Sequence, residues 1–350
     1  MAFSNTITVQ SAATQSSDKS PFRGQPETAW GSYRLAACLA ILAVLCSATA
    51  VKTEAGTPSQ PSTIHVGIGS GTWGGVNRND ACAAIKVWAK AILSERGTTV
   101  AVETELFDTP EAGRRALKNG QVDAISMLTE QFLALEPGQR PNTVFVATKD
   151  HSLTERFVLL VNRETGIETL AGLAGRKLLL LANGRTSLAP RWLDTLLAGQ
   201  SLGPAEKLLG TVTKIESPSK AILQVFFHQA EACLVTSNMF EVACELNPQL
   251  RKNLKLLAMS PEVVPALFFF RSDFTASNRQ QLESAILSMH ETTAGLEVLT
   301  VFQSDDMVKR PITCLDGTRQ LLADYERSVH RQATNPPLIS TQTSPPNEPH

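Results

Sequence analysis

Residues Lys177–Ala182 constrain the fold of this chain more than any other stretch, because five of the six are apolar. A strand that is apolar on both faces needs helices on both sides of its sheet, as the central strands of parallel sheets have. The polar run Asn183–Ser187 follows, and apolar residues then recur at helical spacing from Leu188 to Leu197. This order of strand, loop and helix predicts an α/β fold with a mainly parallel sheet.

The loop Asn183–Ser187 brings two hydroxyls to the expected start of the helix. Thr186 or Ser187 is predicted to be the N-cap, and Pro190 fits a first helical turn. Free backbone N–H groups at a helix start, together with hydroxyls, form a natural site for an anion. Two interpretations stay open for these hydroxyls, a helix cap alone or a contact with a bound oxyanion, and one hydroxyl can serve each purpose. Arg185 is either an anion contact or a solvated cation.

Two stretches of the chain alternate between strands and helices. In the first, strands are predicted at 63–69, 100–107 and 122–127, and helices start near 79, at 110 and at 129. In the second, strands are predicted at 177–182, 211–216 and 232–235, and helices at 190–198, 219–227 and 238–246. Strands and helices that alternate with short loops indicate βαβ units in a parallel sheet.

Two pairs of strand-like segments interrupt this alternation. Thr143–Thr148 and Arg156–Asn162 are joined by a polar segment and are predicted to form an antiparallel pair that leaves the first series. Leu254–Met259 and Val264–Arg271 are predicted to carry the chain back. Helices are expected after the return at 278–290, 294–303 and 317–329. Two α/β series joined by an outward and a returning crossover predict two lobes with a cleft between them.

The predicted lobe 1 comprises residues 63–157 and 262–330, and the predicted lobe 2 comprises 158–261. The crossover strands at 154–162 and 254–271 are expected to act as hinges. Ligands of open α/β sheets bind beyond the C-terminal ends of the strands, which directs attention to the loops there. The residues expected to contact a ligand are mainly hydroxyl-bearing: Ser70, Thr72, Trp73, Thr129, Phe132, Arg185, Thr186, Ser187, Thr236 and Ser237.

The N-terminal part has the pattern of an export signal. Residues 1–32 are rich in Ser, Thr and Gln and are expected to be disordered, as is the tail 331–350. In the predicted signal segment 33–55, Arg34 precedes the apolar run Leu35–Val44, and small residues then lead to Ala50, as before a secretory cleavage site. The alternative is an uncleaved membrane anchor, for which the apolar run is short.

Composition and motifs exclude several classes of function. The net charge is −1, and acids and bases are almost equal in number, so no basic face for nucleic acid is expected. Gly69–Gly74 matches the pattern G-x-G-x-x-G, but its Trp73 would crowd a pyrophosphate and no suitable acidic partner follows. The sequence carries no G-x-S-x-G, H-E-x-x-H or P-loop motif. We therefore expect no enzymatic activity and no cofactor.

Four cysteines remain outside the signal segment: Cys82, Cys233, Cys244 and Cys314. Their spacing is not that of metal ligands, so we expect no metal, whereas one disulfide stays open for an exported protein. A monomer is expected.

Several segments resemble those of a known family. Leu170–Leu178 is similar to the entry into its second lobe, and Gly120–Ala124 and Gln229–Ala232 are similar to two Gly-x-Val-Asp-Ala segments that begin strands. From about Thr63 to Val329 the chain resembles the periplasmic substrate-binding proteins of phosphate, phosphite and phosphonate ABC transporters. The resemblance implies a bilobal type 2 periplasmic-binding-protein fold, in which the loop 183–187 contacts the phosphoryl group.

Two positions depart from the family pattern. Leu128, Thr129 and Phe132 stand where a Gly-Pro pair and a Tyr are common, so a phenolic ligand contact is lost and Phe132 or Trp73 is expected to form an apolar wall. Thr236 stands where an acidic residue can meet the ammonium group of an aminophosphonate, which disfavours that ligand.

These observations predict an exported periplasmic protein that captures a small phosphate- or phosphonate-like oxyanion between its lobes and hands it to an ABC permease of the inner membrane. The alternative is a periplasmic ligand sensor of a membrane signalling system with the same fold, which the possible anchor at Leu35–Ala50 motivates. An enzyme on this scaffold would need a nucleophile beside a base, and the sequence offers no strong candidate.

Overall fold

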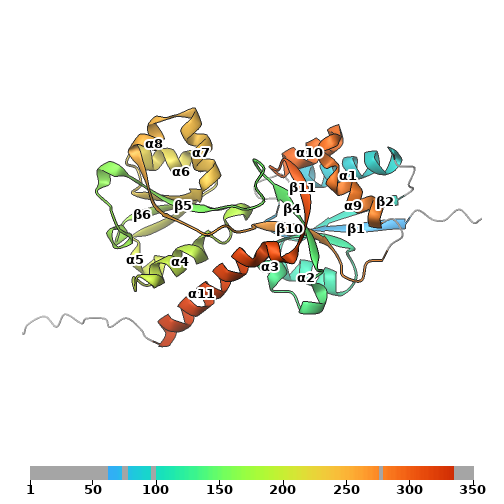
Figure 1. Cartoon of the computed structure of the whole chain (residues 1–350), viewed down its shortest axis with the longest axis horizontal. Helices are drawn as coiled ribbons and strands as arrows, with labels where there is room; N and C mark the ends of the chain where they lie inside the picture. The colour runs from blue at the N-terminus through green and yellow to red at the C-terminus, as the bar shows by residue number, and fades with distance from the viewer. Residues whose placement is uncertain (1–61, 73–77, 96–99, 276–278, 335–350) are drawn as a thin grey trace, which may run out of the picture. The chain divides into compact units, whose positions relative to one another are not determined.

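The computed structural model describes residues 62–72, 78–95, 100–275 and 279–334 and places their strands in two sheets (Figure 1). Sheet 1 has the strand order β11-β4-β10-β3-β1-β2, and sheet 2 has the order β7-β6-β8-β5-β9. The strands of sheet 1 are β1 (Ser62–Ile68), β2 (Val100–Leu106), β3 (Ala124–Leu128), β4 (Thr143–Thr148), β10 (Ala266–Phe270) and β11 (Asp306–Pro311). Those of sheet 2 are β5 (Phe157–Asn162), β6 (Lys177–Leu181), β7 (Thr211–Ile215), β8 (Ala232–Thr236) and β9 (Leu254–Met259).

Lobe 1 is sheet 1 with helices on both faces. One face packs against α1 (Arg78–Glu95), α9 (Arg279–Leu287) and α10 (Thr293–Val301), and the other packs against α2 (Pro110–Lys118) and α3 (Thr129–Leu133) (Figure 1). The side chains alternate as a covered sheet requires: Phe268 and Phe270 of β10 face α9, whereas Phe269 packs on Phe132 of α3. The helix α2 begins as expected, because the Thr109 hydroxyl accepts a hydrogen bond from the Ala112 N–H at 3.2 Å.

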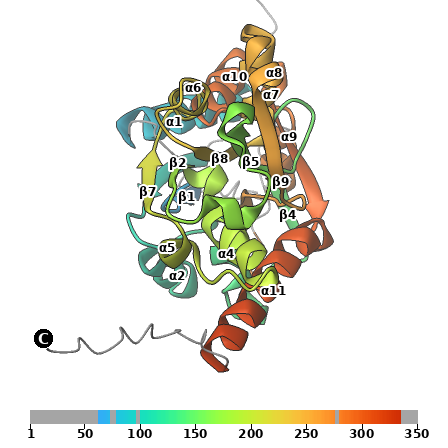
Figure 2. The same ribbon diagram turned by 90° about the vertical axis from the view of Figure 1, so that its left-hand side faces the viewer.

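Lobe 2 repeats the layered arrangement around sheet 2 (Figure 2). Its strand β6 is fully covered, as the apolar run predicted: Leu178 and Leu180 face the core on the α4 (Ala189–Gly199) side, and Leu179 and Leu181 face the opposite helices. These opposite helices are α6 (Pro218–Phe226), α7 (Ser237–Leu246) and α8 (Gln249–Asn253), and the short α5 (Ala205–Leu208) lies beside α4. A strand buried on both faces stabilises both cores at once.

The sheets are mixed rather than parallel throughout. The pairs β1–β2, β1–β3, β6–β7 and β6–β8 are parallel, whereas every pair that includes β4, β5, β9, β10 or β11 is antiparallel. The predicted antiparallel pairing of Thr143–Thr148 with Arg156–Asn162 is wrong, because β4 lies in sheet 1 and β5 lies in sheet 2. The polar segment between them is the crossover from one lobe to the other and not a hairpin turn.

Two crossover segments therefore connect the lobes, residues 149–156 and 260–265. They run antiparallel: Glu155 N–H donates to the Val263 carbonyl at 2.8 Å, and Val263 N–H donates back at 2.9 Å. The predicted return strands β9 and β10 are confirmed, since they pair in sheet 2 and sheet 1 respectively. The chain bends at these short segments, and most of the expected hinge region 154–162 is instead the buried strand β5.

The C-terminal helix α11 (Asp316–Thr334) belongs to both lobes, although the sequence assigned all of 262–330 to lobe 1. The Thr318 hydroxyl accepts a hydrogen bond from Val264 N–H at 3.0 Å, near the start of β10. One turn later, Leu321 is buried in the core of lobe 2, where α11 packs on α4 (Figures 1 and 2). The helix also extends four residues into the predicted tail.

We expect the substitution Leu321→Ala to lower the free energy of unfolding by about 2–5 kcal/mol, because it empties a buried leucine site. Chemical denaturation measures this loss. The matched control is Val329→Ala on the same helix, whose side chain is 46% exposed and whose replacement should cost less than about 1 kcal/mol. Equal losses for the two variants would contradict the docking of α11 on lobe 2.

Several sequence predictions fall on residues outside this description. The disordered N-terminal extension, the signal segment 33–55, Trp73 and residues 335–350 lie outside the described ranges. Within those ranges, no helix combines the length and the apolar character that a membrane span needs. Cys82, Cys233, Cys244 and Cys314 are free thiols, so the disulfide left open by the sequence is not formed among them.

Candidate functional site

The loop Asn183–Ser187 forms a single 3₁₀ turn, η4 (Gly184–Thr186), before helix α4. The Asn183 side chain accepts from Thr186 N–H at 3.1 Å, and the Thr186 hydroxyl accepts from Asn183 N–H at 3.1 Å and donates to the Leu181 carbonyl at 2.6 Å. Thr186 or Ser187 as N-cap of the following helix is therefore wrong. The turn caps itself, and α4 starts after Leu188 without a side-chain cap. The buried Thr186 hydroxyl holds the loop in shape rather than facing a ligand.

Ser187 is the hydroxyl of this loop that faces lobe 1. Its Oγ lies 3.3 Å from a carboxylate oxygen of Glu130, which is the second residue of α3. The guanidinium of Arg191, one turn along α4, approaches the same carboxylate at 3.9 Å. Burial raises the pKa of Glu130, and the nearby Arg191 and Ser187 only partly offset that effect. The loop 183–187 and helix α4 of lobe 2 thus both contact the start of α3 in lobe 1, through the Glu130 carboxylate.

Two polar groups near this carboxylate lack hydrogen-bond partners. The Thr129 hydroxyl is buried with no partner among the described residues, and the same is true of Nη1 of Arg191. Buried polar atoms without partners are rare in folded proteins, and each calls for an explanation. Together with Ser187 they give this region three groups able to donate to an anion.

The backbones of the two lobes touch at the loop. A Cβ built on Gly184 would lie 1.8 Å from the carbonyl oxygen of Gly71, which follows β1 in lobe 1. Real Cβ atoms do not approach within 3.0 Å, so only glycine allows this contact. The loop of lobe 2 thus closes directly on the end of a central strand of lobe 1.

Arg185 connects the loop to both lobe 1 and the crossover. It donates to Glu155 at 2.6 Å and to the Gln303 carbonyl at 2.9 Å. Glu155 is buried, and this desolvation raises its pKa despite the ion pair with Arg185. Because its charge is already balanced by Glu155, Arg185 offers an incoming anion less attraction than a free cation would.

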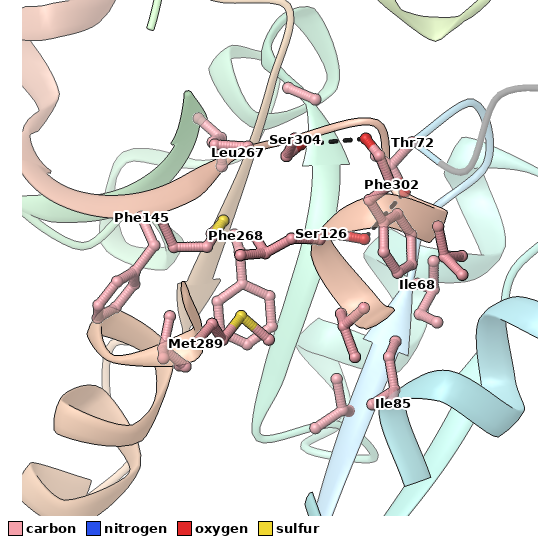
Figure 3. A pocket seen from close by; sticks show the side chains of 18 of the residues that line it. Ile68, Thr72, Ile85, Ser126, Phe145, Leu267, Phe268, Met289, Phe302 and Ser304 are labelled. Carbon is pink, nitrogen blue, oxygen red and sulfur yellow. Dashed lines mark hydrogen bonds between the residues drawn. The ribbon is translucent and has the colours of Figure 1, made fainter. Parts of the chain in front are cut away.

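A cavity of about 230 Å³ opens beside this loop. It extends into lobe 1, between sheet 1 and the helices α1, α9 and α10 (Figure 3). Asn183, Gly184 and Arg185 of lobe 2 also line it. Thr72 and Ser126 line it as well, and their hydroxyl oxygens lie 2.9 Å apart, which ties the end of β1 to β3. The cavity joins the interlobe loop to the interior of lobe 1.

The other expected ligand residues lie elsewhere. Phe132 is fully buried between α3 and sheet 1, with its ring 5.0 Å from that of Phe269, so it belongs to the core and forms no wall of this cavity. Thr236 is buried, and its hydroxyl caps α7 by accepting from Met239 N–H at 3.4 Å. The Ser237 backbone N–H donates to the Arg156 carbonyl at the crossover. The Ser70 carbonyl accepts a hydrogen bond from the Gln131 side chain.

Sequence reasoning missed four residues of this region: Ser126, Glu130, Glu155 and Arg191. A faint signal existed for Ser126, a hydroxyl within an otherwise apolar strand, and for Glu130, an acid in the first turn of a helix at a strand end. The sequence gives no such signal for Glu155 and Arg191. The path of the crossover brings Glu155 to the loop, and the docking of α4 brings Arg191 to Glu130.

The buried carboxyls make stability depend on pH. Glu130 and Glu155 both have a pKa above the ordinary value of 4.5, so the folded state holds their protons more tightly than the unfolded state does. Lowering the pH from 7 toward 4.5 should therefore relieve a destabilising contribution. At pH 7 the double variant Glu130→Gln, Glu155→Gln should have a higher free energy of unfolding than wild type. We expect this difference to shrink as the pH falls toward 4.5, and denaturant titrations at several pH values measure it. A constant difference would contradict the burial of these groups.

Solved structures share this fold. The chain is similar to a Xanthomonas citri protein bound to ATP, with a TM-score of 0.54, 16% identity, and coverage of 77% of this chain and 98% of that one. It is also similar to a binding protein component of an ABC phosphonate transporter from Pseudomonas aeruginosa, with a TM-score of 0.52, 16% identity, and coverage of 80% and 91%. A third is PhnD1 from Prochlorococcus marinus in complex with methylphosphonate, with a TM-score of 0.50, 17% identity, and coverage of 76% and 99%. The bilobal fold of type 2 periplasmic binding proteins is thereby confirmed.

No curated protein matches the chain. A family model does, over residues 85–310, and its description is "ABC transporter, phosphonate, periplasmic substrate-binding protein". The matched region runs from α1 to β11 and includes the whole of lobe 2, the loop 183–187 and both crossovers. Proteins of this kind capture a small solute for a membrane permease without changing it chemically. The chain therefore belongs to the family of periplasmic substrate-binding proteins of phosphonate ABC transporters, and it is a binding protein and not an enzyme.

Proposed function

We propose that this protein captures a phosphonate- or phosphate-like oxyanion between its two lobes, at the point where the loop 183–187 meets the ends of β1 and β3. The observation that carries the proposal is the contact of Ser187 with Glu130 across the lobes. The Thr129 hydroxyl and Nη1 of Arg191 are buried donors without a hydrogen-bond partner among the described residues. An oxyanion supplies the acceptors that these donors need.

The proposed contacts come from both lobes. Ser187 and Arg191 of lobe 2 and the Thr129 hydroxyl of lobe 1 donate to the phosphoryl oxygens, and Thr72 completes the site at the end of β1. Each hydrogen bond to a charged acceptor contributes about 1.5–3 kcal/mol. A few such bonds suffice for a micromolar dissociation constant, which corresponds to about −8 kcal/mol.

Glu130 competes with the ligand in this proposal. Its carboxylate stands near Ser187 and Arg191, where an anionic ligand would bind. A dianionic ligand must displace that carboxylate or meet it in the protonated form, which its raised pKa favours. Glu130 thus keeps Ser187 and Arg191 in position for the ligand. It also weakens the binding of weakly basic anions, because these compete poorly with its carboxylate.

Ligand contacts on both lobes favour the closed state by their differential affinity, and the permease recognises that state. The paired crossover segments at Glu155 and Val263 are the proposed hinge, because they are the short connections at which the chain passes between the sheets. Export through the segment 33–55, action as a monomer and delivery to an inner-membrane permease complete the proposal.

Thermal-shift and calorimetric titrations of the purified protein test the ligand class. We expect methylphosphonate to raise the melting temperature, phosphate and phosphite to do so to comparable or smaller extents, and sulfate and acetate to have little effect. If none of the phosphorus oxyanions raises the melting temperature, the proposal is contradicted.

The variant Ser187→Ala tests the site itself. It should weaken methylphosphonate binding about 10- to 100-fold, because it removes one hydrogen bond to a charged acceptor. Ser272→Ala is the matched control, since that exposed serine of lobe 1 donates to the Gly138 carbonyl and lies outside the proposed site. Unchanged affinity in S187A would remove this loop from the site.

A further inference from the structure

The cavity in lobe 1 is larger and far less polar than a small oxyanion requires. We propose that it is a second part of the ligand site and takes an apolar substituent of a phosphonate, about the size of a phenyl or hexyl group. This inference rests on the proposed function, because it places the phosphoryl head at the interlobe loop. It adds the chemical class of the ligand: an organophosphonate with an alkyl or aryl chain.

The walls of the cavity are apolar. Sheet 1 contributes Ile64, Val66 and Phe268, and the helices opposite contribute Ile85, Ile286 and Val298. Among the described residues that line it, Arg185 is the only one with a charged side chain, and it is paired with Glu155. A free phosphate ion would lose its hydration here and gain no partner, whereas an alkyl chain would be stabilised by burial.

The polar groups gather at one end. Thr72 and Ser126 are joined at 2.9 Å, and Arg185 donates to Gln303 at 2.9 Å. In Figure 3 the labelled hydroxyl residues Thr72, Ser126 and Ser304 lie in the upper part of the view, and Met289 and Ile85 lie at the opposite, apolar end. This polar end adjoins the loop 183–187. A ligand with a charged head and an apolar tail matches such a division.

The size of the cavity sets the size of the tail. Native interiors contain few voids larger than a water molecule, and an apolar cavity of about 150 Å³ is enough to bind benzene. The cavity of about 230 Å³ therefore has room for a phenyl ring or a short alkyl chain.

Trp88 adds a polar group to the apolar wall of the cavity. It lines the cavity, and its indole N–H is buried with no acceptor among the described residues. Buried N–H donors are nearly always paired, or they face a group that arrives with a ligand. A ring face or an ether oxygen in the ligand tail would serve this donor.

Calorimetry with hexylphosphonate, phenylphosphonate and methylphosphonate tests the inference. Each buried methylene raises affinity about fourfold, so hexylphosphonate should bind at least about 30-fold more tightly than methylphosphonate even if its chain is only partly buried. If none of the three compounds binds, the proposed function itself fails. If methylphosphonate binds as tightly as hexylphosphonate, the proposed function stands and the tail site is wrong.

A cavity-filling variant locates the tail. Val66→Phe should remove the advantage of hexylphosphonate and leave methylphosphonate binding within about threefold of wild type. Val212→Phe, on the exposed face of β7, is the matched control and should change neither. Retention of the hexyl advantage in a folded V66F protein would overturn the inference.

A second measurement holds even if V66F does not fold. Saturating 6-bromohexylphosphonate should quench the fluorescence of wild type more than that of Trp88→Phe, because the bromine enters the cavity that Trp88 lines. Equal fractional quenching in the two proteins would overturn the inference.

Discussion

Replacing Gly184 by alanine is expected to weaken methylphosphonate binding by at least about 100-fold while leaving both lobes folded. The added Cβ would lie 1.8 Å from the Gly71 carbonyl oxygen, a distance that real Cβ atoms do not reach. The loop must therefore stay more than an ångström farther from lobe 1, and the closed arrangement of the lobes is disfavoured. The Gly184 backbone lies outside the left-handed region, so alanine fits lobe 2 itself without strain. A penalty of about 3 kcal/mol on the closed state corresponds to this loss of affinity.

The matched control is Gly199→Ala at the end of α4, where a Cβ meets nothing within 4 Å. G199A should bind like wild type and melt at the same temperature or slightly higher, because alanine favours helix over glycine. Calorimetry and thermal melting of both variants provide the comparison. Wild-type affinity in G184A would mean that the bound lobes do not close onto the Gly71 contact.

Replacing Arg185 by methionine is expected to cost about 3–5 kcal/mol of unfolding free energy at pH 7.5, because it leaves the buried Glu155 carboxylate without its cation. For a chain of this size the melting temperature should fall by about 4–9 °C. The ion pair spans the loop of lobe 2 and the crossover segment, so the loss should affect the whole folded protein rather than one exposed loop.

The origin of this loss can be separated by pH and by a second substitution. Burial already raises the pKa of Glu155 above 4.5, and loss of Arg185 raises it further, so protonation of Glu155 as the pH falls from 7.5 toward 4.5 should recover stability. The double variant Arg185→Met, Glu155→Gln should be more stable than R185M alone at pH 7.5. Arg251→Met breaks the exposed pair with Glu241 and should leave the stability close to that of wild type, because water screens this pair. A pH-independent loss in R185M would contradict the assignment to an unpaired carboxylate.

The sequence predicted those parts of the fold that depend on local pattern. The apolar run 177–182 is β6, buried on both faces, and the Thr109-Pro110 start of α2 is capped as expected. The passage from lobe 1 to lobe 2 and back was also predictable, because it appears as a break in the alternation of strands and helices. Burial pattern and capping are properties of neighbouring residues, so a single sequence contains them.

The errors concern contacts between distant segments. Thr143–Thr148 and Arg156–Asn162 have the composition of a hairpin, but each has better partners in its own sheet. Among the expected site residues, the Thr186 hydroxyl bonds within its own loop and the Thr236 hydroxyl caps α7. Their contact with a ligand stays a prediction.

Glu130 illustrates the opposite case. Its sequence context is that of an ordinary acid at a helix start, and only the docking of α4 against α3 brings Ser187 and Arg191 to it. The sequence therefore predicted the loop that faces lobe 1 but not the lobe 1 residue that it meets.

A crystal structure of the complex with methylphosphonate tests the central claim most directly. We expect its phosphoryl oxygens within hydrogen-bond distance of the Ser187 hydroxyl and the Arg191 guanidinium, with Glu130 moved aside and the two lobes closed around the anion. A phosphoryl group bound away from the loop 183–187, or held by one lobe alone, would contradict this account.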